Sequence, residues 1–109
     1  MHLSKSERRI ARKLIDIGLQ KEFRNGMEKF HNITSNWKTK GLNAKESYYE
    51  IFKAVKNFDK HIARRYDGMT GSKYMYIVAE QLGESLITEN DIREFSEETQ
   101  AKIKLLAGV

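Results

Sequence analysis

Apolar residues recur at intervals of three and four positions along the first forty residues, which is the period of one face of an α-helix. Ser4 and Glu7 have the spacing of a capping box at the start of this segment, and no strong breaker follows before Gly41. The pattern therefore predicts one helix over residues 5–40. Its main apolar stripe consists of Ile15, Leu19, Phe23, Met27, Phe30, Ile33 and Trp37.

A second helix is predicted over residues 44–66. Gly41 is a typical helix stop and Asn43 a typical N-cap, so one helix ends and the next begins within a few residues. The second segment has an apolar stripe of similar spacing and ends before Gly68. That stripe consists of Tyr48, Phe52, Val55, Phe58, Ile62 and Tyr66.

The short connection between the two segments predicts an antiparallel helical hairpin. Two helices of equal rise that turn back on each other align their apolar stripes layer by layer, so the pattern also predicts a register. The central layers of this register pair Phe30 with Val55, Met27 with Phe58 and Phe23 with Ile62.

The start of the first helix extends beyond the end of the second and carries another apolar stripe on its opposite side. We expect the C-terminal part of the chain to cover this stripe, because three short helices are predicted there, at about 72–82, 89–94 and 97–107. The predicted fold is all-α: a long antiparallel hairpin capped by three short helices, in a single domain over residues 1–109. The additional stripe consists of Ile10, Leu14 and Ile17.

The residue types that are absent narrow the functional classes. The chain has no cysteine, which excludes disulfides, thiolate metal sites and cysteine nucleophiles. Its start has no apolar segment of the signal-peptide type, and no stretch approaches the roughly 18 apolar residues that span a bilayer. We therefore expect a cytoplasmic protein that does not bind membranes.

The net charge of +5 is unevenly distributed along the chain. Residues 1–42 carry ten Lys and Arg against four Asp and Glu, residues 43–73 carry seven against four, and residues 74–109 carry three against seven. A basic hairpin followed by an acidic segment favours internal complementarity between the two, although an anionic partner explains the same pattern.

The connection after the second helix contains the candidate anion-binding residues. Two arginines end one helix where the next one starts, and hydroxyls, free N–H groups and a lysine at such a joint are suited to an anion. The structural alternative is an ordinary joint, in which arginines favour a helix C-terminus and a hydroxyl caps the following helix. The candidate residues are Arg64, Arg65, Thr70, Ser72 and Lys73.

No catalytic residue, cofactor site or metal site is predicted. Glu28 and His31 have the Glu-x-x-His spacing of di-iron bundles, but such a site needs two of these motifs and further carboxylates. No serine lies in a nucleophile motif of the Gly-x-Ser-x-Gly type. A helix-turn-helix over residues 79–94 is disfavoured because its recognition helix would present Glu89, Asp91 and Glu94 to phosphates.

These observations favour a small, non-enzymatic helical protein that binds a macromolecular partner. A protein partner or a second copy of the chain is favoured over nucleic acid, because basic residues are dense only in residues 8–13 and at Arg64 and Arg65. The alternatives are a nucleic-acid-associated protein that uses these clusters for phosphate contacts, and a small enzyme whose site has no motif.

Overall fold

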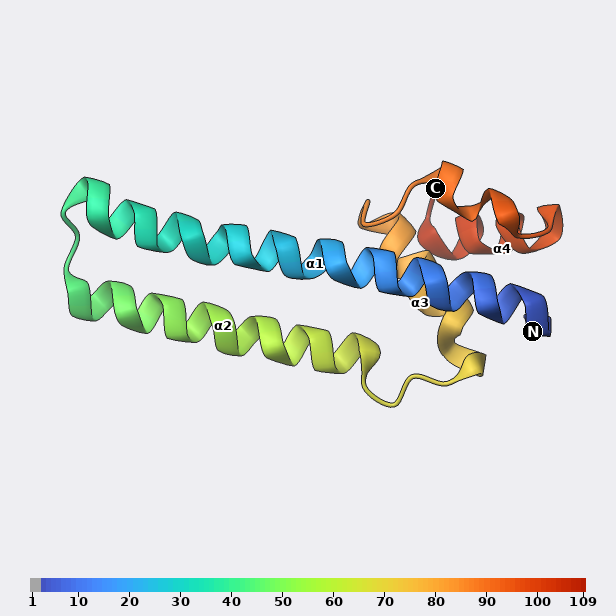
Figure 1. The fold of residues 1–109 in the computed structure, drawn as a ribbon, viewed down its shortest axis with the longest axis horizontal. Helices are drawn as coiled ribbons and strands as arrows, with labels where there is room; N and C mark the ends of the chain where they lie inside the picture. Colours follow the sequence, from blue (N-terminus) through green and yellow to red (C-terminus); the bar gives the residue numbers. More distant parts are fainter. Residues whose placement is uncertain (1–2) are drawn as a thin grey trace. The chain divides into compact units, whose positions relative to one another are not determined.

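The computed structural model describes residues 3–109, and its regular elements are all helical (Figure 1). The two long helices were predicted with their observed bounds, and the all-α prediction is confirmed. In chain order the elements are α1 (Lys5–Lys40), α2 (Ala44–Tyr66), the 3-10 helix η1 (Gly71–Lys73), α3 (Tyr74–Gly83), the 3-10 helix η2 (Glu89–Glu94) and α4 (Glu97–Ala107).

Side-chain caps explain why several helices begin where they do. Asn43 accepts a hydrogen bond from the backbone N–H of Glu46 at the start of α2, as its position after Gly41 predicts. Ser96 caps α4 in the same way, through the N–H of Thr99. Local chemistry therefore fixes the helix boundaries, independently of packing.

The described chain divides into two compact units. The first, called the core unit here, contains the chain up to Lys21 together with Gly68–Val109. The second, the hairpin unit, contains Glu22–Asp67. Helix α1 contributes residues to both units.

The core unit has a closed hydrophobic core. Helix α1 contributes a face at steps of three and four, and Gln81 of α3 donates a hydrogen bond from Nε2 to the carbonyl oxygen of Ile15 at 3.0 Å. A methyl group on Gly18 would lie 2.4 Å from Nε2 of Gln81, so α3 packs at this point because Gly18 has no side chain. The buried apolar residues are Leu3, Ala11, Leu14, Ile15, Met75, Ile77, Val78, Ala79, Leu82, Leu86, Ile87, Ile92, Phe95 and Ile103.

The prediction for the second stripe of α1 is only partly right. Leu14 is buried, whereas Ile17 is 46% exposed and Ile10 is half-buried. The buried face instead comprises Ala11, Leu14 and Ile15, which lie at i, i+3 and i+4. This buried face lies between the two predicted stripes. The sequence pattern therefore assigned Ile15 to the main stripe and Leu14 to the additional one.

In the hairpin unit α1 and α2 run antiparallel, side by side, and are joined by a turn in which Gly41 has a φ of 61° (Figure 1). The ring of Phe58 lies between those of Phe23 and Phe30, with centroid distances of 5.3 and 5.8 Å. A methyl group on Gly26 would lie 2.7 Å from the Phe58 ring. Gly26, and not Met27 as predicted, therefore lies against Phe58.

Candidate protein-binding surfaces

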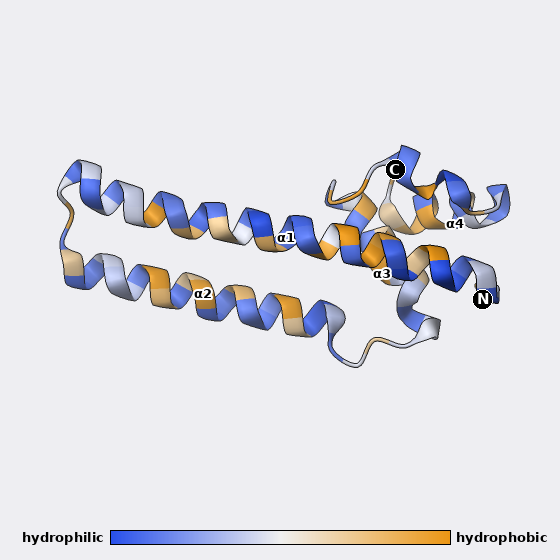
Figure 2. Ribbon diagram, in the orientation of Figure 1, coloured by the Kyte–Doolittle hydropathy of each residue, from blue (hydrophilic) through white to orange (hydrophobic). Residues whose placement is uncertain are grey.

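The predicted apolar stripes of the hairpin unit are largely exposed. This corrects the expectation that they form a core between α1 and α2. Figure 2 shows hydrophobic bands alternating with hydrophilic ones along α2. We call the exposed set the hairpin surface. It comprises Phe23, Met27, Trp37, Tyr48, Phe52 and Val55, which are between 39% and 65% exposed.

Helix geometry explains this exposure. Two helices in contact bury a narrow strip of each, whereas an apolar stripe of the width seen here extends about 100° or more around each helix. Gly26 and Phe58 occupy the line of contact, so residues at the edges of the stripes, such as Met27 and Phe52, face solvent. Side chains of this size and exposure are typical of a surface that another chain covers.

Aromatic rings gather near the start of α2. The rings of Tyr48 and Phe52 are stacked with centroids 6.5 Å apart, and Tyr49 meets Tyr48 edge-on at 5.4 Å. All three side chains are more than half exposed. The sequence pattern assigned Tyr48 to the core, and the structure shows it on the surface. Tyrosine is also a residue type that binding interfaces favour, because it presents a large rigid ring with a polar end.

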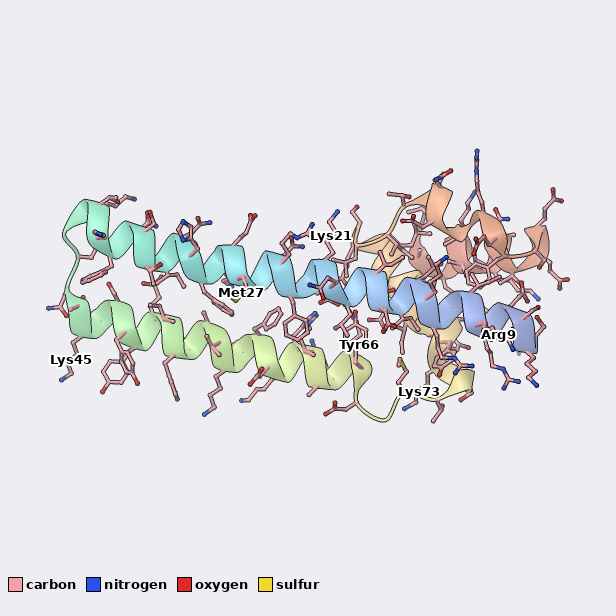
Figure 3. The ribbon with its side chains drawn as sticks, viewed as in Figure 1. Arg9, Lys21, Met27, Lys45, Tyr66 and Lys73 are labelled. Carbon is pink, nitrogen blue, oxygen red and sulfur yellow. The ribbon has the colours of Figure 1, made fainter. Side chains whose placement is uncertain are left out.

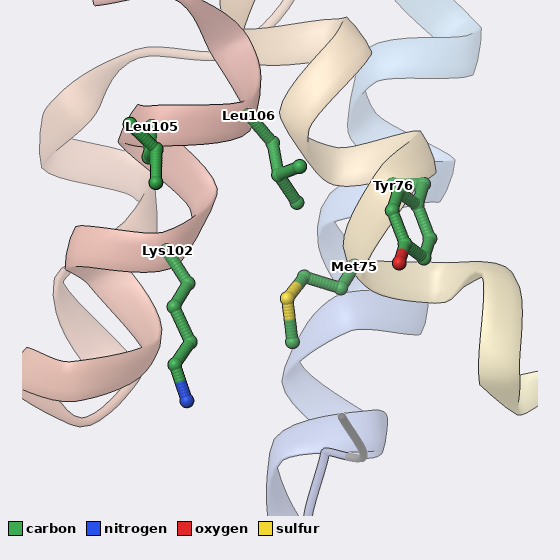
Figure 4. Close-up of a pocket in the computed structure, with 5 residues that line it drawn as sticks. All are labelled: Met75, Tyr76, Lys102, Leu105 and Leu106. Atoms are coloured by element: carbon green, nitrogen blue, oxygen red, sulfur yellow. The ribbon is translucent and has the colours of Figure 1, made fainter.

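A second exposed apolar set lies in the core unit, between α3 and α4. We call it the α3–α4 surface; it was not predicted from the sequence. Leu105 is 80% exposed, and Leu106 and Tyr76 are about half exposed. Figure 4 shows the side chains of Met75 and Leu106 directed into the space between the two helices. The hollow has a volume of about 190 Å³ and is lined by Met75, Tyr76, Lys102, Leu105 and Leu106.

The rim of the α3–α4 surface carries an ion pair. Lys102 Nζ lies 2.8 Å from Oε1 of Glu98, one helical turn earlier on α4. The hydrogen bond and charge of Lys102 hold the pKa of Glu98 below its ordinary value. An apolar hollow with a charged rim has the arrangement of a protein-binding surface, in which apolar contacts supply affinity and the rim supplies orientation.

The end of α2 contains a polar cluster that the sequence analysis did not foresee. Glu22 of α1 is buried, and its carboxylate accepts hydrogen bonds from His61 Nε2 at 2.7 Å, from Arg65 Nη1 at 2.9 Å and from the hydroxyl of Tyr66. Figure 3 shows Tyr66 at the end of α2, on the side of α1. Burial alone would raise the pKa of Glu22, but these hydrogen bonds and the charge of Arg65 outweigh it and lower the pKa.

The candidate anion-binding residues belong to different units. Arg64 is exposed on the hairpin unit, whereas the side chain of Arg65 is only 6% exposed and its guanidinium binds Glu22. In the core unit Thr70 and Ser72 share a hydrogen bond of 3.0 Å between their hydroxyls, and Lys73 is exposed in η1. An anion site at these residues stays a prediction, in which Arg65 already has a carboxylate partner.

Two further findings concern chemistry. Glu28 and His31 line a shallow, open hollow on α1, and in residues 3–109 no group of three or more His, Asp or Glu side chains is placed to hold a metal ion. None of the helices in that same range is both long enough and apolar enough to cross a membrane.

The fold is shared with a known protein. No protein-family model matches the chain, and no curated protein matches it in sequence. Two solved structures of the Fluorescence Recovery Protein from Synechocystis sp PCC 6803, one of them a mutant, each have a TM-score of 0.80 to this chain. Each match covers 98% of this chain and 99% of the other at 20% sequence identity, which shows a common fold over the full length of both.

Proposed function

We propose that this chain is a non-enzymatic helical protein that works by binding other protein chains, one of which is a second copy of itself. The observation that supports this most directly is the exposure of large apolar side chains on both units. The similar fold supports it too, since the Synechocystis protein has a name that refers to an effect on fluorescence and not to a chemical conversion.

The hairpin surface is the proposed site of self-association. Two helices alone leave the edges of their apolar stripes in water, and a second hairpin packed on the first would complete a four-helix arrangement that covers them. The surface is long, since it extends from Phe23 near one end of the hairpin unit to Tyr48 near the turn. A surface of this length gives a second copy of the hairpin an extended apolar contact.

Self-association is tested by light scattering after size exclusion, with wild type compared with Phe52→Lys. Phe52 is more than half exposed, so lysine fits the monomer but places a charge in the proposed interface. We expect a dimer for wild type and a monomer for the variant. Asn57→Lys adds the same charge at an exposed position on another face of α2 and should leave the dimer intact. A monomeric wild-type protein would exclude this part of the proposal.

The α3–α4 surface is proposed to bind a different protein. The test is affinity capture from the native cells with wild type, with the pair Tyr76→Lys and Leu105→Lys, and with Phe52→Lys. Tyr76 and Leu105 are exposed, so their replacement should leave the core intact. We expect a partner that wild type and Phe52→Lys retain and the Tyr76 and Leu105 pair loses. A partner that binds all three proteins equally would exclude this surface.

Nucleic acid is the alternative partner. Its phosphate contacts would come from residues 8–13 and Arg64, since Arg65 is held by Glu22. Binding of this kind weakens steeply with salt, whereas binding through apolar surfaces does not. A captured partner that is lost between about 50 and 200 mM salt and is removed by nuclease would therefore favour the alternative. The cytoplasmic location expected from the sequence is part of the proposal.

A further inference from the structure

The turn between α1 and α2 gives the hairpin unit an end with exposed apolar side chains. Gly41 has a φ of 61°, and the N–H of Leu42 donates a hydrogen bond to the carbonyl of Trp37 at 3.2 Å. These are features of a Schellman motif, which commonly places the residue after the glycine near the residue that accepts the bond. The motif explains why an apolar residue follows Gly41, but it leaves Trp37 42% and Leu42 45% exposed.

The start of α2 adds two aromatic rings to this end. The rings of Tyr48 and Tyr49 meet edge-on, and both side chains are more than half exposed. We call residues 37–49 the hairpin tip. Tryptophan and tyrosine are the residue types enriched where a membrane meets water, because each combines an apolar ring with a polar group. The aromatic side chains of the tip are therefore of the type that binds at such a boundary.

Lysines accompany these apolar side chains. Lys38, Lys40 and Lys45 lie within four residues of Gly41 and are exposed. Figure 3 shows Lys45 at this end of the hairpin, directed away from α1. Residues 29–45 contain no Asp or Glu, so no acidic side chain in this stretch offsets the lysines. The hairpin tip therefore combines exposed apolar groups with a local positive charge, which favours an anionic partner.

We propose that the hairpin tip binds the surface of an anionic membrane, with Leu42 and the aromatic rings inserted among the lipid headgroups and the lysines in contact with lipid anions. The proposal goes beyond the proposed function and does not rest on it. It revises the expectation from the sequence that the chain does not bind membranes. That expectation was based on the lack of a spanning segment and a signal peptide, and binding at a membrane surface needs neither.

The combination of side chains favours lipid over other partners. An aliphatic side chain such as Leu42 has no π-face on which a nucleic-acid base could stack, whereas it gains from insertion at the boundary between headgroups and acyl chains. A second copy of the tip would bring the same lysines together, and like charges repel. Anionic lipids of the cytoplasmic leaflet also match the cytoplasmic location expected from the sequence.

The fluorescence of the whole chain tests this proposal directly, because Trp37 is its single tryptophan. The protein is mixed with vesicles of phosphatidylcholine alone, or with about one-third phosphatidylserine added. With the anionic vesicles we expect the emission of Trp37 to shift to shorter wavelength and to be quenched by brominated acyl chains. Cosedimentation should show at least about tenfold tighter binding to the anionic vesicles, lost as salt rises to about 0.5 M. An unchanged emission with anionic vesicles would overturn the proposal.

Substitutions separate the tip from the overall charge. Lys40→Ala with Lys45→Ala should weaken binding to anionic vesicles at least about tenfold, since each lysine near such a surface contributes about fivefold. Leu42→Ser changes no charge and should weaken binding about threefold. The control pair, Lys56→Ala with Lys60→Ala, removes two exposed charges further along α2, more than a Debye length from the tip, and should cost less than about twofold. Equal losses from the two pairs, with no effect of Leu42→Ser, would show that only net charge matters.

Other partners of the tip give different results. If a second copy covers Trp37, the emission depends on protein concentration and vesicles do not change it. If nucleic acid is the ligand, a single-stranded oligonucleotide shifts the emission and anionic vesicles do not. Either result would overturn the proposal. Trp37 and Tyr48 also belong to the hairpin surface, so Phe52→Lys is measured as well. This variant should bind anionic vesicles at least as tightly as wild type, whether or not the wild-type protein is a dimer.

Discussion

The core unit and the hairpin unit use apolar residues in opposite ways. In residues 3–109 every buried hydrophobic side chain belongs to the core unit, whereas the buried polar residues are divided, with Gln81 and Thr99 in the core unit and Glu22 and Ser47 in the hairpin unit. The hairpin unit has an equally regular apolar pattern, but its large side chains are half exposed. A periodic stripe therefore predicts that a helix face is to be covered, and it does not say by which chain.

The difference follows from the number of elements in each unit. In the core unit part of α1 packs with α3, η2 and α4, so its buried face has neighbours on more than one side. In the hairpin unit each helix has one neighbour, and one line of contact through Gly26 and Phe58. Stability of the isolated chain should consequently come from the core unit, and association from the hairpin unit.

The largest effect on the free energy of unfolding is expected when a buried apolar side chain of the core unit is truncated. Truncation of an apolar side chain in the hairpin unit provides the comparison. Ile92 is completely buried, and Ile92→Ala should lower the free energy of unfolding by about 2–5 kcal/mol because it leaves a cavity. Phe52→Ala, measured in the monomeric form at low concentration, should cost less than about 1 kcal/mol, since its ring is more than half exposed. Denaturant unfolding measures both. Similar costs would show that the hairpin unit has a closed core of its own in solution.

A sharper comparison uses the same substitution at two places on α1. In Gly18→Ala the new methyl group meets the amide of Gln81, which is fully buried and hydrogen-bonded to Ile15. In Gly26→Ala it meets the Phe58 ring, which is only half-buried. Both substitutions gain about 1 kcal/mol from the higher helix propensity of alanine. In Gly18→Ala the cost of the clash with Gln81 exceeds this gain, and we expect a net loss of about 1–2 kcal/mol. In Gly26→Ala gain and cost should nearly cancel, and we expect little change.

Thermal unfolding of these two variants is the measurement, since a loss of 1 kcal/mol shifts the Tm of a domain this size by about 4–8 °C. A larger loss for Gly26→Ala than for Gly18→Ala would contradict the comparison. The same scans show whether the chain melts in one transition, as a single domain over 1–109 requires, or in two that correspond to the units.

These comparisons also show how far the sequence could be interpreted. Caps and stops such as Asn43 and Ser96 are local, and they were sufficient to predict the bounds of α2 and α4. The helix predicted at 72–82 has no side-chain cap, and the structure divides it into η1 and α3. Whether Gly26 or Met27 lies against Phe58 depends on how closely the two helix backbones approach. A pattern of apolar residues treats glycine as a gap, so it does not predict a close approach at Gly26. Residues at the edge of a stripe, such as Ile17, depend on which neighbour is present.

The polar cluster was missed for a different reason. Glu22 has no unusual sequence context, and its three partners lie about forty residues away, so only the fold brings them together. One signal was available: a glutamate directly beside the apolar stripe faces arginine and histidine near the end of an antiparallel partner. For the α3–α4 surface no such signal was found in the sequence, where buried Leu82 and exposed Leu105 both lie in short helices.

A third effect concerns pH. Glu22 in the hairpin unit and Glu7 in the core unit both have lowered pKa values; burial opposes the shift in each, and hydrogen bonds, including that of the Ser96 N–H to Glu7, outweigh it. A lowered folded pKa gives stability at neutral pH that is lost in acid. Unfolding between pH 7 and pH 3 should show this loss, and Glu22→Gln should reduce it by about 1 kcal/mol, more than Glu7→Gln does, because Glu7 accepts no charged donor.

The smallest effect is expected for anion binding. The comparison is between Arg64 and Lys73, one from each unit, and two lysines near the hairpin turn. The anion-site hypothesis requires Arg64, Lys73 and the nearby hydroxyls to contribute more than their charge alone. Arg65 is left unchanged, because its replacement would also disrupt its ion pair with Glu22. The test pair is Arg64→Ala with Lys73→Ala, and the control pair is Lys38→Ala with Lys40→Ala, which removes two exposed charges near the turn.

If the site exists, the test pair should weaken heparin binding about threefold more than the control pair at low salt, because a convergent site adds hydrogen bonds to the general attraction of a basic surface. Titration with inorganic phosphate separates a local site from this general attraction, since a small anion cannot contact several distant lysines at once. Equal losses from the two pairs, together with no phosphate binding, would show that Arg64 and Lys73 act only through the net charge.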